Sequence, residues 1–267
     1  MTDSLRIKPG RKLRLEDIDT DGQSFAPGDK EKTQAATLKR VQRIGELQEL
    51  LYAGHQHRVL IVFQGMDTSG KDGATRKVFA ETSPQGVRVV SFKKPTELEL
   101  DHDYLWRVHA QMPGRGELVV FNRSHYEDVL VVRVHSLVTK KVWSKRYEQI
   151  VAFERQLAAE GTTILKFFLH ISAEEQRERL QARLDDPTKH WKFQHGDLAE
   201  RKLWPDYTRA YEEAIARTST KEAPWHIVPA DRKWARDWII SGFIIDALEK
   251  LKMRYPEPAD LEGLEVV

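Results

Sequence analysis

A glycine-rich loop that directly follows a continuous apolar run is the feature that most constrains this chain. Residues 59–63 read Val-Leu-Ile-Val-Phe, which is typical of a strand buried on both faces and therefore of a parallel sheet. The glycine-rich loop, residues 65–71, has the spacing Gly-x-x-x-x-Gly-Lys, and a helix is expected from Asp72 onward. A strand, this loop and a helix in that order predict a phosphate site at one edge of a sheet.

Each part of the loop has a physical reason to bind phosphate. Gly65 and Gly70 let backbone N–H groups curl around an anion, at which the following helix points its positive end. Lys71 adds a compact charge that can follow a phosphoryl group during transfer. Asp72 stands where a Mg²⁺-binding hydroxyl usually follows the lysine, so Asp67 is the expected replacement. A chance glycine turn is the alternative, but the spacing, the lysine and the context all match a phosphate site.

Strand and helix patterns alternate along the rest of the chain. Further strands are expected at residues 87–92, 117–121, 163–171 and 225–228. Helices are expected at residues 33–53, 72–79, 104–112, 147–159, 173–184, 198–216 and 234–251, the first of them closed by Gly54. This alternation predicts an α/β fold, a five-stranded parallel sheet with helices on both faces.

The two ends of the chain lack such patterns. Residues 1–32 are polar without a sustained period, so we expect an N-terminal arm that lies on the surface or is partly disordered. A single domain over residues 33–255 and a C-terminal tail over residues 256–267 should follow, because no composition break marks a second domain.

The composition excludes several classes of protein. The chain has no cysteine, which excludes disulfides, zinc–thiolate sites and thiol nucleophiles. Its 43 Lys and Arg against 41 Asp and Glu give a net charge of +2, and its mean hydropathy is −0.57. No run approaches the ~18 apolar residues of a membrane span, and the first residues do not resemble a signal peptide. We therefore expect a cytoplasmic protein without a membrane partner. The charge alone does not rule out a nucleic acid, but no nucleic-acid partner is expected, because the charge is mixed and the chain has no motif that reads bases.

A second polar group, residues 122–128, follows the strand expected at residues 117–121. Ligands bind beyond the carboxyl ends of parallel strands, so this group should share an edge with the glycine-rich loop. Carboxylates at this place suit Mg²⁺, and the fork of Arg123 suits a phosphoryl oxygen. Taken alone, the segment could equally be an ordinary polar loop with a surface ion pair.

A third group is basic. Arg179 and Arg183 are four residues apart and share one helix face, and a lysine-rich loop with a proline follows at residues 185–192. This arrangement favours a lid that closes over phosphates, although arginines paired with nearby glutamates on a solvated helix are the alternative. Further cations would form a groove for a polyanion if they converge: Arg76, Lys77, Lys93, Lys94 and Lys192.

Together these motifs resemble the family-2 polyphosphate kinases, phosphotransferases that move phosphate between inorganic polyphosphate and nucleotides. The similarity runs from about Leu38 to the end of the last expected helix. The matching stretches are residues 64–67, 69–73, 84–87, 121–130, 175–176 and 191–192 with Arg179 and Arg183 between them, and 223–225. Several motifs in the same order make this resemblance more specific than the loop alone.

The resemblance implies a P-loop kinase fold like that of thymidylate kinases, with a lid at about residues 173–200 and Mg²⁺, or alternatively Mn²⁺, as cofactor. It implies that Asp67 and Asp128 hold the metal. The catalytic or phosphate-binding cations that it implies are Lys71, Arg123, Arg133, Arg179 and Arg183. The loop residues expected to contact phosphate with them are Gly65, Thr68, Ser69, Gly70 and Asp72.

The stretch Asn-Arg-Ser-His-Tyr-Glu-Asp at residues 122–128 resembles the branch of the family that phosphorylates both nucleoside mono- and diphosphates. Many members carry an aspartate where this chain has Asn122, which weighs against a metal role there. Asn122 and Glu127 are therefore expected to select the nucleotide.

We thus expect Mg²⁺-dependent, reversible phosphoryl transfer from polyphosphate to AMP and ADP, giving ATP, with guanine nucleotides as further candidates. Such transfer depends on positioning and charge stabilisation more than on a base. An ATP-dependent nucleotide kinase of the thymidylate-kinase type is the main alternative, a non-catalytic polyphosphate-binding module the second and a nucleic-acid binder the third. A homo-oligomer is also expected, because the apolar, tryptophan-containing closing helix would suit a subunit contact.

Overall fold

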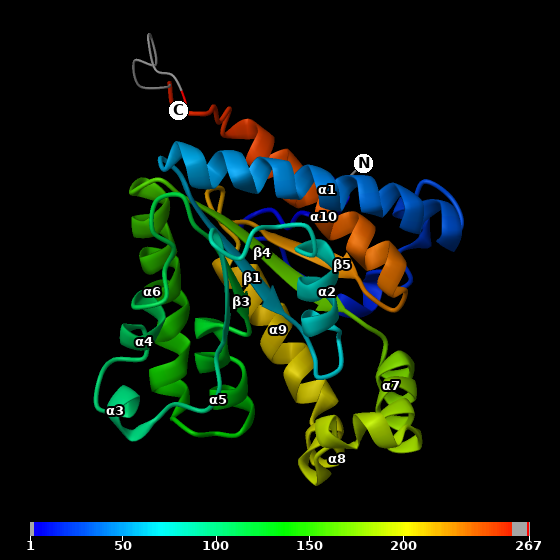
Figure 1. Cartoon of the computed structure of the whole chain (residues 1–267). Helices are drawn as coiled ribbons and strands as arrows, with labels where there is room; N and C mark the ends of the chain where they lie inside the picture. Colours follow the sequence, from blue (N-terminus) through cyan, green and yellow to red (C-terminus); the bar gives the residue numbers. More distant parts are fainter. Residues whose placement is uncertain (1–2, 258–265, 267) are drawn as a thin grey trace.

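The computed structural model describes residues 3–257 and residue 266, and within them five strands form one parallel sheet (Figure 1). The strands are β1 (Arg58–Gln64), β2 (Val87–Ser91), β3 (Leu118–Asn122), β4 (Thr162–His170) and β5 (Trp225–Pro229). Their order across the sheet is β2-β3-β1-β4-β5. The predicted α/β class, the number of strands and their parallel direction are confirmed.

The central strand β1 positions the glycine-rich loop. Phe63, near the end of β1, is in register with Asn122 of β3 on one side and with Phe167 of β4 on the other. Residues 59–63 have no solvent exposure, as the apolar run predicts for a strand covered on both faces. The loop after β1 therefore begins between the carboxyl ends of two neighbouring strands, held by a rigid core.

Helices cover both faces of the sheet (Figure 1). On one face α1 (Lys30–Gly54) and α10 (Lys233–Lys250) lie side by side and contact α2 (Lys71–Val78). On the other face α6 (Lys140–Ala159) contacts α9 (Trp204–Thr218). The shorter helices are α3 (Glu97–Leu100), α4 (Trp106–His109), α5 (Val131–Val134), α7 (Ala173–Asp185) and α8 (His195–Lys202). None of the helices in the described ranges is long and apolar enough to cross a membrane.

The structure corrects several predicted helices. The helix predicted at residues 198–216 is two helices, α8 and α9, which separate at Leu203 just before Pro205. Proline cannot donate the backbone hydrogen bond that would continue α8, so it opens a new helix instead. The helix predicted at residues 104–112 is shorter, α4, and no pattern in the sequence predicts α3 or α5. Gly54 lies within α1, and the left-handed residue that ends this helix is His55 (φ 48°).

The N-terminal arm differs most from the expectation. Leu5, Ile7 and Leu15 are buried in the hydrophobic core, so the prediction of a surface or disordered arm is wrong for them. The N–H of Ile7 donates to the carbonyl of Trp225 in β5 (2.8 Å), and Ser219 Oγ donates to the carbonyl of Ile7 (2.6 Å). The arm therefore covers the free edge of β5. Most of the predicted C-terminal tail lies outside the described residues.

Ile7→Ala tests whether the arm belongs to the fold. The side chain is only 3% exposed, so its truncation should leave a cavity and lower the free energy of unfolding by about 2–4 kcal/mol. Arg11→Ala, at an exposed position of the same arm, should change it by less than about 0.5 kcal/mol. Urea denaturation measures both. An Ile7→Ala variant as stable as the wild type would mean that the arm does not pack on the core.

Candidate active site

The glycine-rich loop between β1 and α2 requires glycine at both glycine positions of its motif, residues 65 and 70. Gly65 (φ 155°) and Gly70 (φ 93°) have positive φ angles. A Cβ atom at Gly65 would lie 2.7 Å from the carbonyl oxygen of Leu169, and one at Gly70 would lie 2.2 Å from Nη1 of Arg236. Neither position can hold a side chain without displacing its neighbours. The loop can therefore approach other groups closely with its backbone.

Lys71 opens α2 and places its ammonium group inside the loop. Its Nζ donates to the carbonyl oxygens of Gly65 (2.9 Å) and Met66 (3.2 Å) and to Ser69 Oγ (3.3 Å). Burial, helped by the positive charge of Arg123, lowers the pKa of Lys71 to about 8. Gly65 and Ser69 thus contact Lys71 rather than line the cavity. A bound anion would stabilise the charged form of this lysine.

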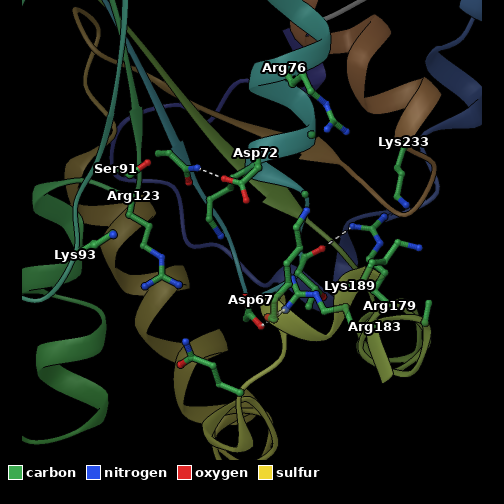
Figure 2. Close-up of a pocket in the computed structure, with 18 of the residues that line it drawn as sticks. Asp67, Asp72, Arg76, Ser91, Lys93, Arg123, Arg179, Arg183, Lys189 and Lys233 are labelled. Atoms are coloured by element: carbon green, nitrogen blue, oxygen red, sulfur yellow. Dashed lines mark hydrogen bonds and ion pairs between the residues drawn. The ribbon is translucent and has the colours of Figure 1, made fainter. Parts of the chain in front are cut away.

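A cavity of about 890 Å³ opens over the loop (Figure 2). Eleven Lys and Arg side chains and two carboxylates, those of Asp67 and Asp72, are among its lining residues. Figure 2 shows Lys93 and Arg123 on one side of the cavity, with Arg179, Arg183, Lys189 and Lys233 on the other. Such an excess of positive charge favours binding of a polyanion.

Most of the residues predicted for the groove do converge. Arg76, Lys93, Lys94 and Lys192 all line the cavity, and so do Thr68, Gly70 and Asp72 of the predicted phosphate contacts. Lys77 is the exception: it is exposed on α2 and does not line the cavity, because Arg76 occupies the helix position that faces it.

The predicted lid is formed by α7, the 3-10 helix Pro187–Lys192 and α8, which project beyond the sheet (Figure 1). Arg179 of α7 donates to the carbonyl of Thr68 in the loop (2.9 Å) and, through Nη2, to that of Ala230 (2.7 Å). Nη1 of Arg183 lies 3.6 Å from a carboxylate oxygen of Asp67. The two arginines share one face and reach the loop, as predicted. The alternative, in which the arginines pair with nearby glutamates, also holds in part, since Arg179 Nε donates to Glu175 (2.6 Å).

Two cations of α10, which no motif in the sequence indicates, also line the cavity. Lys233 lines the cavity, and Arg236 donates from Nη1 to the carbonyl of Gly70 (3.1 Å) while it pairs with Asp237 (2.7 Å). Both residues follow β5, whose carboxyl end reaches the same edge of the sheet as that of β1. The rule that ligands bind beyond strand ends, applied to the last strand as well, would have found them.

The oxygen atoms around Asp67 fit a Mg²⁺ ion that is shared with phosphate. Asp67 Oδ2 and Thr68 Oγ1 are buried and have no hydrogen-bond partner, and the Asp72 carboxylate accepts a hydrogen bond from the side chain of Asn122. Mg²⁺ takes one or two carboxylates and completes its shell with waters and phosphate oxygens. In the part of the chain that the structure describes, no group of three or more Asp, Glu or His side chains could hold a metal by itself.

The structure corrects the pairing of Asp67 with Asp128. Asp128 does not line the cavity, and its carboxylate instead accepts a hydrogen bond from Arg146 of α6 (2.8 Å). Asp128 ends the 3-10 helix His125–Asp128 after β3, and its carboxylate is paired with α6. The second carboxylate in the cavity is that of Asp72.

Arg133 also lies away from the cavity. Its Nη1 donates to Glu213 Oε2 (2.6 Å) and to the hydroxyl of Tyr147 (3.0 Å), and its guanidinium stacks on the ring of Trp143. The structure therefore does not bring Arg133 to the predicted phosphate site, because its charge is already paired between α6 and α9.

The two predicted nucleotide selectors take different places. Asn122 lines the cavity and contacts Asp72. Glu127 is not among the lining residues, but its Oε1 accepts a hydrogen bond from Gln64 at the end of β1 (3.0 Å). Its charge also acts to raise the pKa of Lys71, against the stronger effect of burial. Glu127 thus lies beside the glycine-rich loop, within electrostatic reach of its lysine.

Known proteins resemble this chain over most of its length. The family model described as Polyphosphate kinase 2 (PPK2) matches residues 28–256. The chain is 56% identical to the AMP/ADP-polyphosphate phosphotransferase of Meiothermus ruber over 253 residues, 95% of each chain. It is 45% identical to the ADP-polyphosphate phosphotransferase of Rhodopseudomonas palustris, over 100% of this chain and 96% of the relative. The crystal structure of polyphosphate kinase 2 from Arthrobacter aurescens TC1 has a TM-score of 0.92 at 42% identity, covering 99% of this chain and 93% of that one.

The lowered pKa of Lys71 predicts that anion binding weakens at alkaline pH. The lysine is protonated below its pKa of about 8 and loses its charge above it. The affinity for inorganic triphosphate should therefore fall by roughly fivefold or more between about pH 7 and about pH 9.5. Calorimetric titration measures this affinity. Lys71→Arg, which stays charged over the range, is the control for ionisation of the ligand. The same pH dependence in both proteins would contradict the prediction.

Proposed function

The chain belongs to the polyphosphate kinase 2 family, and on this premise we propose that it transfers a phosphoryl group from inorganic polyphosphate to nucleoside mono- and diphosphates. The observation that carries the proposal is the cavity, where eleven cationic side chains face two carboxylates around a phosphate-binding loop. A long chain of phosphate groups neutralises charges spread over such a surface, whereas one small anion neutralises only a few of them.

The lining of the cavity favours polyphosphate over ATP as the phosphate donor. Among the described residues that line it, Phe92 is the only aromatic one. Its ring packs edge-on against the core residue Phe121 (4.8 Å between ring centroids) and is only 8% exposed as a residue. A purine base would need an apolar or aromatic surface there. The lysines and arginines offer binding to phosphate groups instead.

AMP and ADP are the acceptors that we propose. The relative from Meiothermus ruber is named for both nucleotides. In this chain Arg123 lines the cavity on the side away from the lid arginines (Figure 2), and the charge of nearby Glu127 acts to raise its pKa. An acceptor whose terminal phosphate reaches Arg123 would lie opposite a donor held by the lid. Guanine nucleotides as further acceptors stay a prediction of the sequence analysis.

The proposed mechanism rests on positioning and charge. Lys71, Arg123 and Arg183 surround the space where the transferred group must sit, so they can stabilise the charge of its equatorial oxygens. The terminal oxygen of the acceptor attacks in line with the leaving phosphate. A phosphate oxygen is already ionised, so no strong base is needed. The lid arginines close the site and exclude water, which would otherwise hydrolyse the donor.

We also propose Mg²⁺, or alternatively Mn²⁺, as the cofactor. Asp67 would hold it together with phosphate oxygens, and Asp72 lies near enough in the cavity to assist. The ion would supply neutralisation of phosphate charge and a fixed orientation of the phosphate chain.

Cytoplasmic location, homo-oligomer formation and the lack of a nucleic-acid partner stay predictions. The closing helix α10 supports a homo-oligomer less than its sequence suggests, because it packs on α1 of the same chain. Arg40 of α1 stacks on the ring of Trp238, whose Nε1 donates to the carbonyl of Phe25 (3.0 Å).

Formation of ATP with polyphosphate as the sole donor tests the proposal. The wild type should convert ADP, and AMP through ADP, to ATP. Lys71→Ala should lower turnover by at least ~10²-fold, because it removes a charge that stabilises the transition state. Lys77→Ala removes an exposed lysine from the same helix outside the cavity, and should leave turnover within about twofold. A wild type that forms ATP only when a nucleoside triphosphate is the donor would refute the proposal.

A Mg²⁺ titration separates the two candidate carboxylates. Asp67→Asn should raise the Mg²⁺ concentration needed for half-maximal rate by about tenfold or more, since a neutral amide is a poorer ligand than a carboxylate. Asp128→Asn, outside the cavity, should leave this midpoint within about twofold even if the protein is less stable. The reverse pattern would restore Asp128 as the metal ligand.

A further inference from the structure

A buried cluster of charged side chains lies behind the 3-10 helix His125–Asp128. Lys166 of β4 and Glu154 of α6 form an ion pair (Nζ–Oε2 2.5 Å), and both side chains are at most 1% exposed. The other oxygen of Glu154 accepts a hydrogen bond from the hydroxyl of Tyr126 (2.8 Å) and lies 3.2 Å from Nε2 of His125. Nζ of Lys166 also donates to the Tyr126 hydroxyl (2.8 Å). Two side chains of the 3-10 helix are thus tied to a strand and a helix of the core.

A gain in stability is a weak reason for burying this ion pair. Its surroundings are apolar: the rings of Tyr126 and Trp225 meet edge to face (4.7 Å), and both lie 5.2 Å from Nζ of Lys166. Burial opposes the charge of Glu154, but Lys166 and the nearby His125 bring its pKa below the usual range, so the group is a carboxylate. Buried ion pairs seldom stabilise a protein more than apolar side chains of the same volume would.

The segment that the cluster holds carries two residues of the proposed site. Arg123 and Glu127 belong to the same short connection after β3, in which Arg123 has a left-handed backbone (φ 62°). One 3-10 turn supplies few backbone hydrogen bonds, among them Glu127 N to the carbonyl of Ser124 (3.0 Å). His125 and Tyr126 point into the core, with 1% and 0% exposure. Because His125 and Tyr126 are fixed in the core, the backbone that carries Arg123 and Glu127 is fixed as well.

We propose that Glu154 and Lys166 are positioning residues for phosphoryl transfer: through Tyr126 and His125 they hold Arg123 and Glu127 toward the nucleotide. The inference rests on the proposed function. It assigns the cluster to the nucleotide side of the site. The polyphosphate side is built on α2, the lid and α10, and within the described residues none of its cavity-lining cations is hydrogen-bonded to the cluster.

The test compares enzymes in which the ion pair is replaced as a whole. The variant Glu154→Gln/Lys166→Met removes both charges and keeps similar volumes, so no lone charge is left buried. We expect a folded protein whose KM for ADP rises by about fivefold or more, while its KM for polyphosphate stays within about twofold. Ile44→Val in α1, a buried change remote from the segment, controls for general loss of stability and should leave both KM values within about twofold.

A mutant cycle asks whether the cluster acts through Glu127. The double replacement lowers kcat/KM for ADP by some factor in the wild type. In a Glu127→Ala background this factor should be at least about threefold smaller, because the side chain that the cluster positions is absent. A purely structural role predicts the same cost in both backgrounds. If the double variant does not fold, Tyr126→Phe, which removes only the linking hydroxyl, carries the same comparison, with an expected rise of about threefold in the KM for ADP.

Each outcome decides the matter. A folded replacement with wild-type KM values, an equal rise of both KM values, or equal costs in the two backgrounds would overturn the inference. A selective rise of the KM for ADP that depends on Glu127 would support it. A wild type that makes no ATP from polyphosphate would instead refute the proposed function, so the two failures are distinguishable.

Discussion

Repulsion among cations is the constraint on which the rest of this site depends. Eleven Lys and Arg side chains line one cavity that holds only two carboxylates. Backbone carbonyl oxygens hold several of them: Lys71 donates to Gly65, Arg179 to Thr68 and Arg236 to Gly70. Two of these cations are also paired with acids that do not line the cavity, Arg179 with Glu175 and Arg236 with Asp237. These carbonyls fix the cations without cancelling their charge. A polyanion can therefore supply further negative charge. The pKa of Lys71 is lowered mainly by burial and in part by the charge of Arg123, so a bound anion would favour its charged form.

The fold provides the rigidity that such a charged edge requires. Residues 59–63 of β1 are fully buried between helices, and the loop begins where this strand ends. Arginines from two distant elements, α7 and α10, then hold the loop from outside through Thr68 and Gly70. The lid thus contacts the loop directly. The same core supports the opposite side of the site through the ion pair of Lys166 and Glu154, which fixes the segment that carries Arg123.

The sequence predicts those parts of the site that are local in the chain. The glycine-rich loop, its lysine and the strand before it lie within one short stretch, and the pair Arg179 and Arg183 shows its common face by spacing alone. Lys233 and Arg236 carry no motif, and only the sheet order brings them to the cavity. The sequence also cannot show in which direction a turn points a side chain. For this reason Asp128 and Arg133 were candidates for the cavity, although their charges are paired with Arg146 and Glu213. The sequence shows Lys166 as a charged residue inside an apolar strand, but only the fold identifies its partner on α6, Glu154.

The central claim is that the cavity-lining cations of α2, the lid and α10 bind a long chain of phosphate groups. Its most direct test is the calorimetric affinity of the free protein for inorganic phosphate, triphosphate and longer polyphosphates at one pH and one salt concentration. We predict that affinity keeps rising beyond triphosphate, because a longer chain meets further cations of the lid and α10, such as Lys189 and Lys233, and that salt weakens the longer chains most. An affinity that is already complete at triphosphate, with the same salt dependence for every longer chain, would contradict it.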